Sequence, residues 1–539
     1  MLALPLLFLV ALAVLSTATA VSSFEKIPSC RFAKNFKCSD FKDPKKADEY
    51  LSSVMYWEGQ FAQAGVAYDP ASGYTYDGHP LNYTTGELYG EPHLFSAPSK
   101  ESIHVGILAL ALDGNPHALE FVGGFDRTIE LLTLKINGYL KFNENFPGYG
   151  CWTPWVSFDQ EKGIFVPIDS WTKPYYKVPG LDNGEWFWAI YAVSSLLNSK
   201  YKTRYPDLAA QYESFLTCQK NSAKMIYYRG EGNVSATVYI LDPFAAPTPS
   251  NYVHCDGLLN DPYEGETMTQ ILYLFSQWDS EEERDLLWQT KRGLFQKVDY
   301  QIPASLQRKE WGPNLITVQK GWWFSTHEQW KTLLLPYLSR DLPLVRKVFR
   351  NAEKARVFDA YASGLPGLQA SINDVTDGSE DIPDYASACG VQSLAFEPIL
   401  RRDLMTPYGA YGLFLHDQAA GLCWYNNMLL GPRMQSKFGS TEAINANGTE
   451  ISPLTTWDSK ITTVLAMLGG IGAINERALR QEPGGGVFKS AYERFVYVVD
   501  REHRWLFGDE SKVHGEEIPF VLPAVHVPTD ALSDWSLSC

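Results

Sequence analysis

The pattern of apolar and polar positions predicts a chain made mostly of helices. Apolar residues recur three or four positions apart in a long series of stretches, as expected of helices with one buried face. Only two short stretches look like strands, at residues 236–242 and 494–499. The helices are expected at residues 47–63, 101–112, 126–143, 183–198, 206–228, 260–278, 280–296, 326–338, 344–362, 454–470 and 475–481.

The connections between these helices predict how they are arranged. Long loops rich in Gly, Tyr and Trp separate them, notably at residues 68–98 and 144–181, and residues 374–427 look irregular. Loops of this length are usually functional or disordered, and the loop at residues 68–98 is too aromatic for disorder. Helix pairs joined by long loops on one side favour an all-α toroid, in which the loops line a cleft. Because no linker or repeat interrupts residues 21–539, we expect a single catalytic domain there.

The start of the chain and its cysteines favour secretion. An apolar run too short to span a bilayer precedes Ala18-Thr19-Ala20, which is typical of a signal peptide over residues 1–20. The eight cysteines form no CxxC pair, so disulfides are expected rather than a metal site, with Cys30–Cys38 as one possible loop. Three Asn-X-Ser/Thr sequons are compatible with a glycoprotein.

Charge and composition narrow the partners. The net charge of −16 argues against nucleic acid or an acidic polysaccharide. Aromatic residues make up 14% of the chain, and although much of this content belongs to the core, an acidic, secreted chain rich in Trp and Tyr is typical of a sugar-binding protein. Since aromatic rings stack on pyranose faces, we expect a neutral sugar polymer as the partner, and no membrane. The oligomeric state is not predicted.

Two carboxylates stand out in the stretch NDPYEGETMTQILYLFSQW. Asp261 and Pro262 suit the N-cap and first position of a helix, which puts Glu264 at the capping-box position. Capping explains Glu264 without catalysis, whereas Glu266 has no such explanation. Glu266 is therefore the preferred general acid, and Glu264 is the alternative.

Asp458 is the candidate for the second catalytic carboxylate. It interrupts an apolar stripe in LTTWDSKITTVLAMLGG, and burying a carboxylate costs several kcal/mol unless it is paired or functional. The alternative is that Asp458 caps a helix beginning one turn later.

Candidate substrate contacts cluster in KGWWFSTHEQW. Trp322 and Trp323 are adjacent and would point about 100° apart on a helix, so one of them is expected to form a sugar platform. His327 and Glu328 follow, and the second histidine of a zinc-binding HExxH is missing. Asp182, which also suits a capping turn, completes this group of expected contacts.

Other catalytic machinery is absent from the sequence. There is no GxSxG elbow, and the glycines at 484–486 lack the lysine and spacing of a phosphate-binding loop. Carboxylate chemistry remains, which in a secreted, helical and aromatic chain favours glycoside hydrolysis.

The order of several motifs resembles the secreted endo-β-1,2-glucanases, and more distantly the bacterial glycoamylase-like domains. These motifs are GYGCWTPWV, DNGEWFWAIYAV, EGETMTQILYLFS, GWWFSTHEQW, ACGVQSLAFEP with PYGAYG, and SPLTTWDSKITTVLAMLGGI.

The resemblance implies an (α/α)6 toroid that hydrolyses β-1,2-glucan to sophoro-oligosaccharides with inversion and without a cofactor. It implies Glu266 or Glu264 as the general acid and Asp458 as the general base. We also expect Trp152 and Tyr263 to contact the substrate.

Two other functions remain open. A polysaccharide lyase would use a similar toroid but a basic cleft, which the net charge disfavours. A non-catalytic glycan-binding protein would use the same cleft with its carboxylates far from any sugar. Linkage preference and endo versus exo action are not predicted by the residues alone.

Overall fold

A computed structural model describes residues 28–159, 162–168, 176–254, 257–259, 261–380, 383–537 and 539. The expected signal peptide and Cys255 lie outside these residues.

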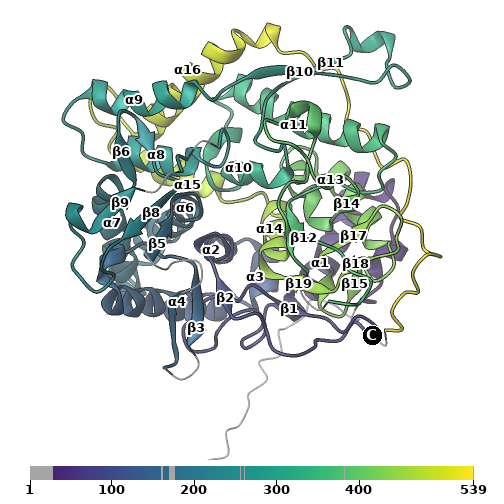
Figure 1. Cartoon of the computed structure of the whole chain (residues 1–539), viewed down its shortest axis with the longest axis horizontal. Coiled ribbons are helices and arrows are strands. Elements are labelled where there is room, and N and C mark those ends of the chain that lie inside the picture. Colours follow the sequence, from purple (N-terminus) through teal and green to yellow (C-terminus); the bar gives the residue numbers. More distant parts are fainter. Residues whose placement is uncertain are drawn as a thin grey trace, which may run out of the picture.

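In the described part of the chain, helices alternate between an outer and an inner ring (Figure 1). The outer ring consists of α1 (Pro44–Phe61), α4 (Phe125–Asn145), α7 (Pro206–Tyr227), α9 (Glu281–Arg292), α11 (Pro343–Ala362) and α13 (Gln418–Leu429). The inner ring consists of α2 (Pro98–Asp113), α6 (Gly180–Leu196), α8 (Glu266–Phe275), α10 (Trp330–Leu334), α12 (Tyr411–Phe414) and α14 (Trp457–Met467). Three further helices are α3 (Pro116–Val122), α15 (Gly472–Gln481) and α16 (Ala491–Phe507).

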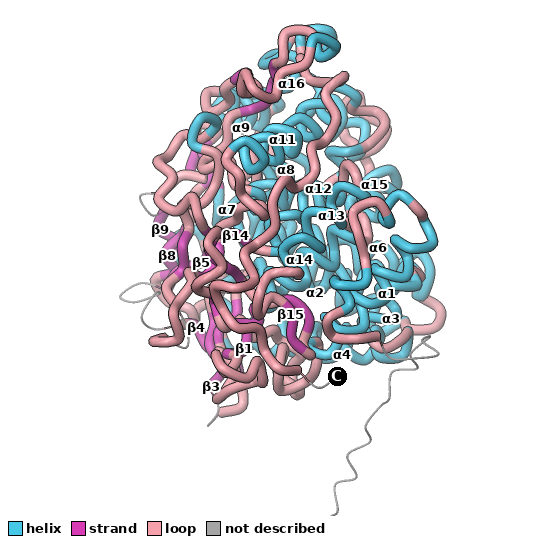
Figure 2. The backbone as a smooth tube through the Cα atoms, turned by 90° about the vertical axis from the view of Figure 1, so that its right-hand side faces the viewer, coloured by secondary structure: helices cyan, strands magenta, loops and turns pink. Residues whose placement is uncertain are grey.

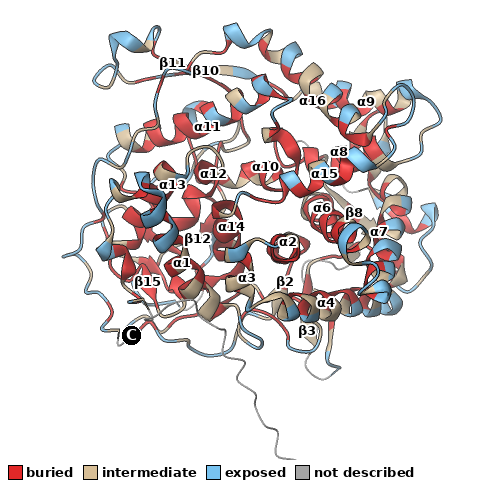
Figure 3. Ribbon diagram, turned by 180° about the vertical axis from the view of Figure 1, so that it is seen from behind, coloured by how far each residue is buried: buried red, intermediate tan, exposed pale blue. Residues whose placement is uncertain are grey.

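The apolar pattern explains which helices lie inside. Helices α2 and α6 are apolar on nearly all sides and almost completely buried, whereas α1 and α4 bury one face only (Figure 3). Helix α2 packs against α6 on one side and α14 on the other, so the last inner helix closes the ring on the first. The fold is therefore an (α/α)6 toroid, and this prediction is confirmed.

The strands are short and lie mostly on one side of the helical body (Figure 2). They pair antiparallel as β1–β19, β2–β3–β4, β5–β8–β9, β6–β7, β10–β11, β12–β13, β14–β17–β18 and β15–β16. Their bounds are β1 Gly78–Pro80, β2 Phe95–Ser96, β3 Val156–Asp159, β4 Ile164–Pro167, β5 Tyr176–Pro179, β6 Tyr228–Gly230, β7 Asn233–Val234, β8 Thr237–Ile240, β9 Tyr252–His254, β10 Lys297–Gln301, β11 Leu315–Gln319, β12 Ile372–Asn373, β13 Tyr385–Ala386, β14 Leu404–Met405, β15 Gln435–Ser436, β16 Gly439–Ser440, β17 Ala443–Asn445, β18 Ile451–Ser452 and β19 Leu454–Thr456.

Two predicted elements near the C-terminus are wrong. The strand expected at 494–499 lies inside α16, where Ser490 caps the helix by accepting the N–H of Glu493. Residues 374–427 are not irregular throughout, because Asp417 caps α13 by accepting the N–H of Ala420. In both places a local cap outweighs the propensity of the following residues.

Three other boundaries shift. The helix expected at 326–338 is divided into η7 (Thr326–Gln329), α10 and η8 (Pro336–Leu338), because Pro336 has no N–H to continue it. The helix expected at 454–470 is preceded by β19 and starts at Trp457. The helix expected at 260–278 is only α8.

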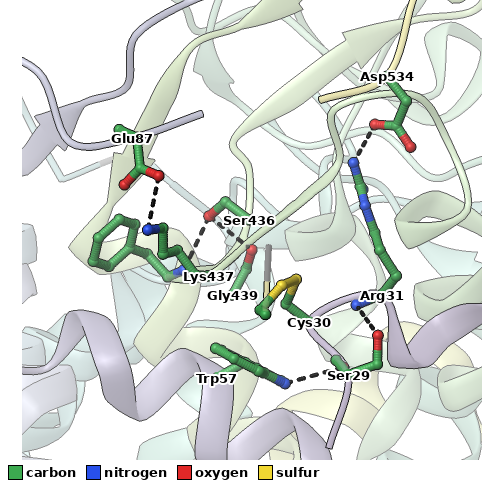
Figure 4. Close-up of a disulfide and its surroundings, with 11 residues drawn as sticks. Ser29, Cys30, Arg31, Trp57, Glu87, Ser436, Lys437, Gly439 and Asp534 are labelled. Atoms are coloured by element: carbon green, nitrogen blue, oxygen red, sulfur yellow. Dashed lines mark hydrogen bonds and ion pairs between the residues drawn. A yellow bond between two sulfur atoms is a disulfide. The ribbon is translucent and has the colours of Figure 1, made fainter. Parts of the chain in front are cut away.

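Disulfides tie the ends of the chain to the toroid. The bonds are Cys30–Cys539, Cys38–Cys423 and Cys151–Cys218, so the expected Cys30–Cys38 pair is wrong. Near Cys30, Arg31 forms an ion pair with Asp534 and Trp57 donates a hydrogen bond to the carbonyl oxygen of Ser29 (Figure 4). The N-terminal and C-terminal segments are thereby held together on one side of the body.

Removing Cys151–Cys218 is expected to lower stability strongly. The bond joins residues 67 positions apart, which on loop entropy contributes about 4 kcal/mol. The double variant Cys151→Ser/Cys218→Ser should therefore unfold at a clearly lower temperature in calorimetry. Cys389→Ser is the control, since buried Cys389 forms no disulfide with another described cysteine. An equal loss in both variants would contradict the expectation.

Candidate functional site

Charged side chains gather where the inner helices begin. Lys100, Asp182 and Asp458 lie in the first turns of α2, α6 and α14. Glu266 is the first residue of α8, and Glu264 stands in the turn before it. Because outer helices alternate with inner ones, the inner helices run in the same direction and their N-termini meet at one end of the ring. Helix N-termini favour negative charge, so this end suits carboxylates.

Asp458 is held by a buried cation. Its Oδ2 lies 3.1 Å from Lys100 Nζ, and the same Nζ lies 2.8 Å from Asp77 Oδ1. Strand β1 brings Asp77 beside α14, where the N–H of Trp457 donates to the Asp77 carbonyl oxygen at 2.8 Å. Burial disfavours the charge of Lys100, but Asp458 and Asp77 raise the pKa of its ammonium group. Since 26% of its side chain is exposed, Asp458 is a partly accessible carboxylate with a buried counter-ion.

Glu442 is a second carboxyl group beside Asp458. Burial and repulsion from Asp458 raise the pKa of Glu442 to about 8. Its Oε2 accepts a hydrogen bond from the hydroxyl group of Thr456. Glu442 therefore keeps its proton to a higher pH than an exposed glutamate does.

Glu264 is a buried carboxyl group in acidic surroundings. The residue is 5% exposed, and its Oε1 has no hydrogen-bond partner among the described residues. Burial, followed by repulsion from Asp261 and then Glu185, raises the pKa of Glu264 well above its ordinary value. A carboxyl group in this setting keeps its proton at a pH where an exposed glutamate has lost it.

The predicted capping role of Glu264 is wrong. Asp261 Oδ1 accepts the N–H groups of Tyr263 at 2.7 Å and Gly265 at 3.2 Å, which forms a turn rather than a helix start. Since α8 begins at Glu266, a capping box starting at Asp261 has no helix to cap. The structural explanation that set Glu264 aside in the sequence is thereby removed.

Glu266 has a structural partner instead. The side chains of Glu266 and Lys331 are at most 1% exposed, and Glu266 Oε2 lies 2.9 Å from Lys331 Nζ. The hydroxyl group of Tyr337 donates to the same oxygen. The Lys331 ammonium group lies 4.7 Å from the ring centre of Tyr263 and 4.8 Å from that of Phe349. Glu266 is thus the counter-ion of a buried lysine in an aromatic cage.

Asp182 and Glu185 both lie near the start of α6, at the end of the inner ring where the site lies. Burial raises the pKa of Asp182 to about 6, although Lys100 lowers it, and Trp155 Nε1 donates to its Oδ2 at 3.0 Å. Because α6 begins at Gly180, Asp182 lies within the helix and does not cap it. Glu185 is completely buried, with both oxygens unpaired among the described residues.

Trp322 and Trp323 lie in a turn before η7 and not on a helix, so the expected helical angle between them does not apply. Both side chains are partly exposed. Glu328 is 1% exposed, and its carboxylate accepts backbone N–H groups of this turn. The His327 ring lies 5.9 Å from that of Trp323, and burial lowers the pKa of His327 to about 3.

The structure places Trp152 and Tyr263 in the core. Trp152 Nε1 donates to Ser222 Oγ at 2.8 Å, and Tyr263 Oη donates to the Gln319 carbonyl oxygen at 2.6 Å. The two side chains are 1% and 0% exposed. Side chains this deeply buried have almost no surface to offer a sugar, so the expected substrate contacts of Trp152 and Tyr263 are not proposed again.

Sequence reasoning missed Lys100, Asp77 and two tyrosines. Tyr385 is 59% exposed, yet surrounding atoms desolvate its hydroxyl group and Asp458 further raises its pKa. Burial, Tyr385 and Asp458 raise the pKa of Tyr408. One signal was available for Lys100, a cation in the first turn of a helix whose residues from Val105 to Leu112 carry no polar side chain. No local pattern marks the tyrosines.

No helix among the described residues is long and apolar enough to cross a membrane. No group of three or more His, Cys, Asp or Glu residues in this part of the chain is arranged to hold a metal ion.

Comparisons with known proteins give closely related solved structures. The endo-β-1,2-glucanase of Talaromyces funiculosus in complex with sophorose is 36% identical, with a TM-score of 0.86 over 94% of this chain and 99% of that one. A Glu-to-Gln mutant of that enzyme with β-1,2-glucan is 35% identical, with the same TM-score and coverage. No curated protein matches the chain in sequence.

More distant structures share the fold alone. The endo-β-1,2-glucanase of Chitinophaga pinensis has a TM-score of 0.53 at 12% identity over 85% of this chain and 98% of that one. A putative glucoamylase of Bacteroides fragilis has a TM-score of 0.59 at 11% identity over 85% of this chain and 96% of that one.

The family model described as endo-β-1,2-glucanase SGL matches residues 74–539. The chain belongs to this family of endo-β-1,2-glucanases.

Proposed function

We propose that this protein is a secreted hydrolase that cleaves β-1,2-glucan internally to sophoro-oligosaccharides, with inversion at the anomeric carbon. Family membership supports the substrate, and the disulfides fit an oxidising compartment. One observation carries the catalytic assignment: two carboxyl groups with opposite surroundings lie at the same end of the inner ring. Glu264 has acidic neighbours, and Asp458 has a cation.

A carboxyl group with acidic neighbours suits the role of general acid, and a carboxyl group beside a cation suits the role of general base. Glu264 is the general acid and donates its proton to the glycosidic oxygen as the bond from that oxygen to the anomeric carbon breaks. Asp458 is the general base and accepts a proton from the water whose oxygen forms the new bond to that carbon. Glu264 ends as a carboxylate and Asp458 as a carboxylic acid, and exchange with solvent restores both.

Substrate contacts are assigned to partly exposed groups. Trp322 and Trp323 offer aromatic surface to a pyranose ring, and Tyr385 and Asp182 offer hydrogen bonds to its hydroxyl groups. His327 stands beside Trp323.

Product analysis tests the function. Purified protein incubated with β-1,2-glucan should release a range of sophoro-oligosaccharides, and proton NMR of the first products should show the α-anomer. Linear β-1,3-glucan should remain intact under the same conditions. Release of the β-anomer would contradict inversion, and an unsaturated product absorbing in the ultraviolet would indicate a lyase. Binding without cleavage would favour the non-catalytic alternative.

A further inference from the structure

The turn that carries Trp322 and Trp323 is fixed by one buried side chain. Glu328 Oε2 accepts the N–H of Trp322 at 3.0 Å, and its Oε1 accepts the N–H of Trp323 at 2.7 Å and that of Ser325 at 3.2 Å. Three backbone N–H groups thus donate to one buried carboxyl group. Glu328 has no exposed surface with which to contact a sugar.

The carbonyl oxygens of the same turn are also occupied. Arg356 donates to the Ser325 carbonyl oxygen at 2.9 Å and to that of Phe324 at 3.3 Å. The N–H of Val391 donates to the Trp323 carbonyl oxygen at 3.2 Å, and that of Glu397 to the Trp322 carbonyl oxygen at 2.9 Å. Backbone N–H groups and carbonyl oxygens of residues 322–325 are therefore both held by hydrogen bonds.

The turn also contains a strained backbone conformation and close packing, which these hydrogen bonds hold in place. Phe324 has a φ of 52°, in the left-handed region that is strained for a non-glycine residue, and its side chain is completely buried. At Gly321 a Cβ atom would overlap Glu328 Oε2, and at Gly390 it would overlap the Trp323 carbonyl oxygen. While Phe324 points into the core, the two indoles keep exposed surface.

We propose that Glu328 is a positioning residue that holds Trp322 and Trp323 as a preformed platform for a glucose unit of a β-glucan. This inference rests on the proposed function, because it assigns the ligand class of the same site. A platform fixed before binding loses little conformational entropy when the sugar stacks on it. Glu328 therefore acts on substrate affinity through the indoles and takes no part in proton transfer.

Calorimetric titration tests the proposal without relying on turnover. All variants carry Glu264→Gln, and the probe is a β-1,2-linked gluco-oligosaccharide of about six units. Adding Glu328→Gln replaces one acceptor oxygen by an amide that cannot accept, so the turn loosens and Kd is expected to rise about tenfold. Trp322→Ala or Trp323→Ala should cause a rise of similar size.

The double-mutant cycle separates positioning from general destabilisation. Once the relevant tryptophan is absent, Glu328→Gln should weaken binding by less than twofold more. Gly321→Ala retains the carboxylate and crowds it, so it should reproduce the rise in Kd if Glu328→Gln does not fold. Glu502→Gln, which changes a buried carboxylate paired with Arg292 and Arg501, is the matched control and should leave Kd unchanged.

Two outcomes overturn the proposal. The first is full additivity of Glu328→Gln with both tryptophan variants, and the second is an unchanged Kd in Glu328→Gln and Gly321→Ala. Failure of the proposed function would give a different result. The protein without any substitution would then bind the oligosaccharide without cleaving β-1,2-glucan, or would not bind the oligosaccharide.

Discussion

Glu264→Gln is expected to lower kcat on β-1,2-glucan by about 10²- to 10⁴-fold while leaving the unfolding temperature nearly unchanged. The glutamine has the same shape but no proton to give the leaving oxygen, and general acid catalysis contributes about this factor. Glu264 makes no ion pair among the described residues, and its Oε1 has no hydrogen-bond partner there, so the substitution breaks little in the fold. Initial rates at several substrate concentrations and a calorimetric scan measure both effects.

Glu266→Gln is the matched control, two residues away. It leaves Lys331 buried without its counter-ion, which costs about 3–5 kcal/mol, so the unfolding temperature should fall. The molecules that remain folded should keep a kcat within about tenfold of the parent. The opposite pattern, with Glu266→Gln inactive at full stability and Glu264→Gln active, would make Glu266 the acid.

The pH dependence of the parent enzyme provides a second check on Glu264. An acid must be protonated to act, and burial with acidic neighbours raises the pKa of Glu264. Activity should therefore persist above the ordinary range of a glutamate and fall as the pH rises through the raised pKa. A profile that already declines near pH 4 would be inconsistent with this role.

Helices with regular periodicity could be predicted from the sequence. The expected bounds at 206–228 and 344–362 differ from those of α7 and α11 by one residue, because apolar spacing is a local property. Helix α16 was missed since Arg494–Val499 is rich in aromatic and β-branched residues, while its cap at Ser490 lies four residues earlier. A strand propensity over six residues is a weaker guide than a cap followed by buried residues at helical spacing.

The candidate site could be located from the sequence, but its roles could not be assigned. The two glutamates near the start of α8 and the aspartate at the start of α14 stand out as carboxylates beside apolar runs. Whether each has a partner depends on contacts that no local pattern contains. Lys331 reaches Glu266 from 65 positions along the chain, and Lys100 reaches Asp458 across 358 positions. Lys331 explains Glu266 as a structural residue and moves the proposed acid to Glu264, whereas Lys100 leaves Asp458 as the proposed base.

Lys100→Met is expected to move the acidic limb of the kcat/KM profile to higher pH. An opposite charge within hydrogen-bond distance favours the ionised form of a carboxyl group, and the substitution removes that charge from between Asp458 and Asp77. A base must be ionised to accept the proton of water. At a pH just above the parent's limb, the variant should therefore lose most of its activity and regain it as the pH rises.

The same substitution should change how stability depends on pH. Burial alone would raise the pKa of Asp77, but Lys100 and His93 together lower it. A carboxyl group with a lowered folded-state pKa stabilises the fold above its unfolded-state pKa and loses that contribution as the pH falls through the folded-state value. Without Lys100 this contribution shrinks, so the variant should gain less stability than the parent as the pH rises from strongly acidic values to about 5.

Two further variants separate charge from packing. Lys100→Arg keeps a cation in the same place and should restore the position of the acidic limb. Lys460→Met removes another buried lysine from α14, whose Nζ pairs with Glu58 at 2.6 Å, and should lower stability without moving the limb. If the limb stays in place in Lys100→Met, or moves equally in Lys460→Met, Lys100 does not tune the base. A shift confined to Lys100→Met would mean that Lys100, on the first inner helix, favours the ionised form of Asp458, on the last inner helix. The contact that closes the inner ring would then also support catalysis.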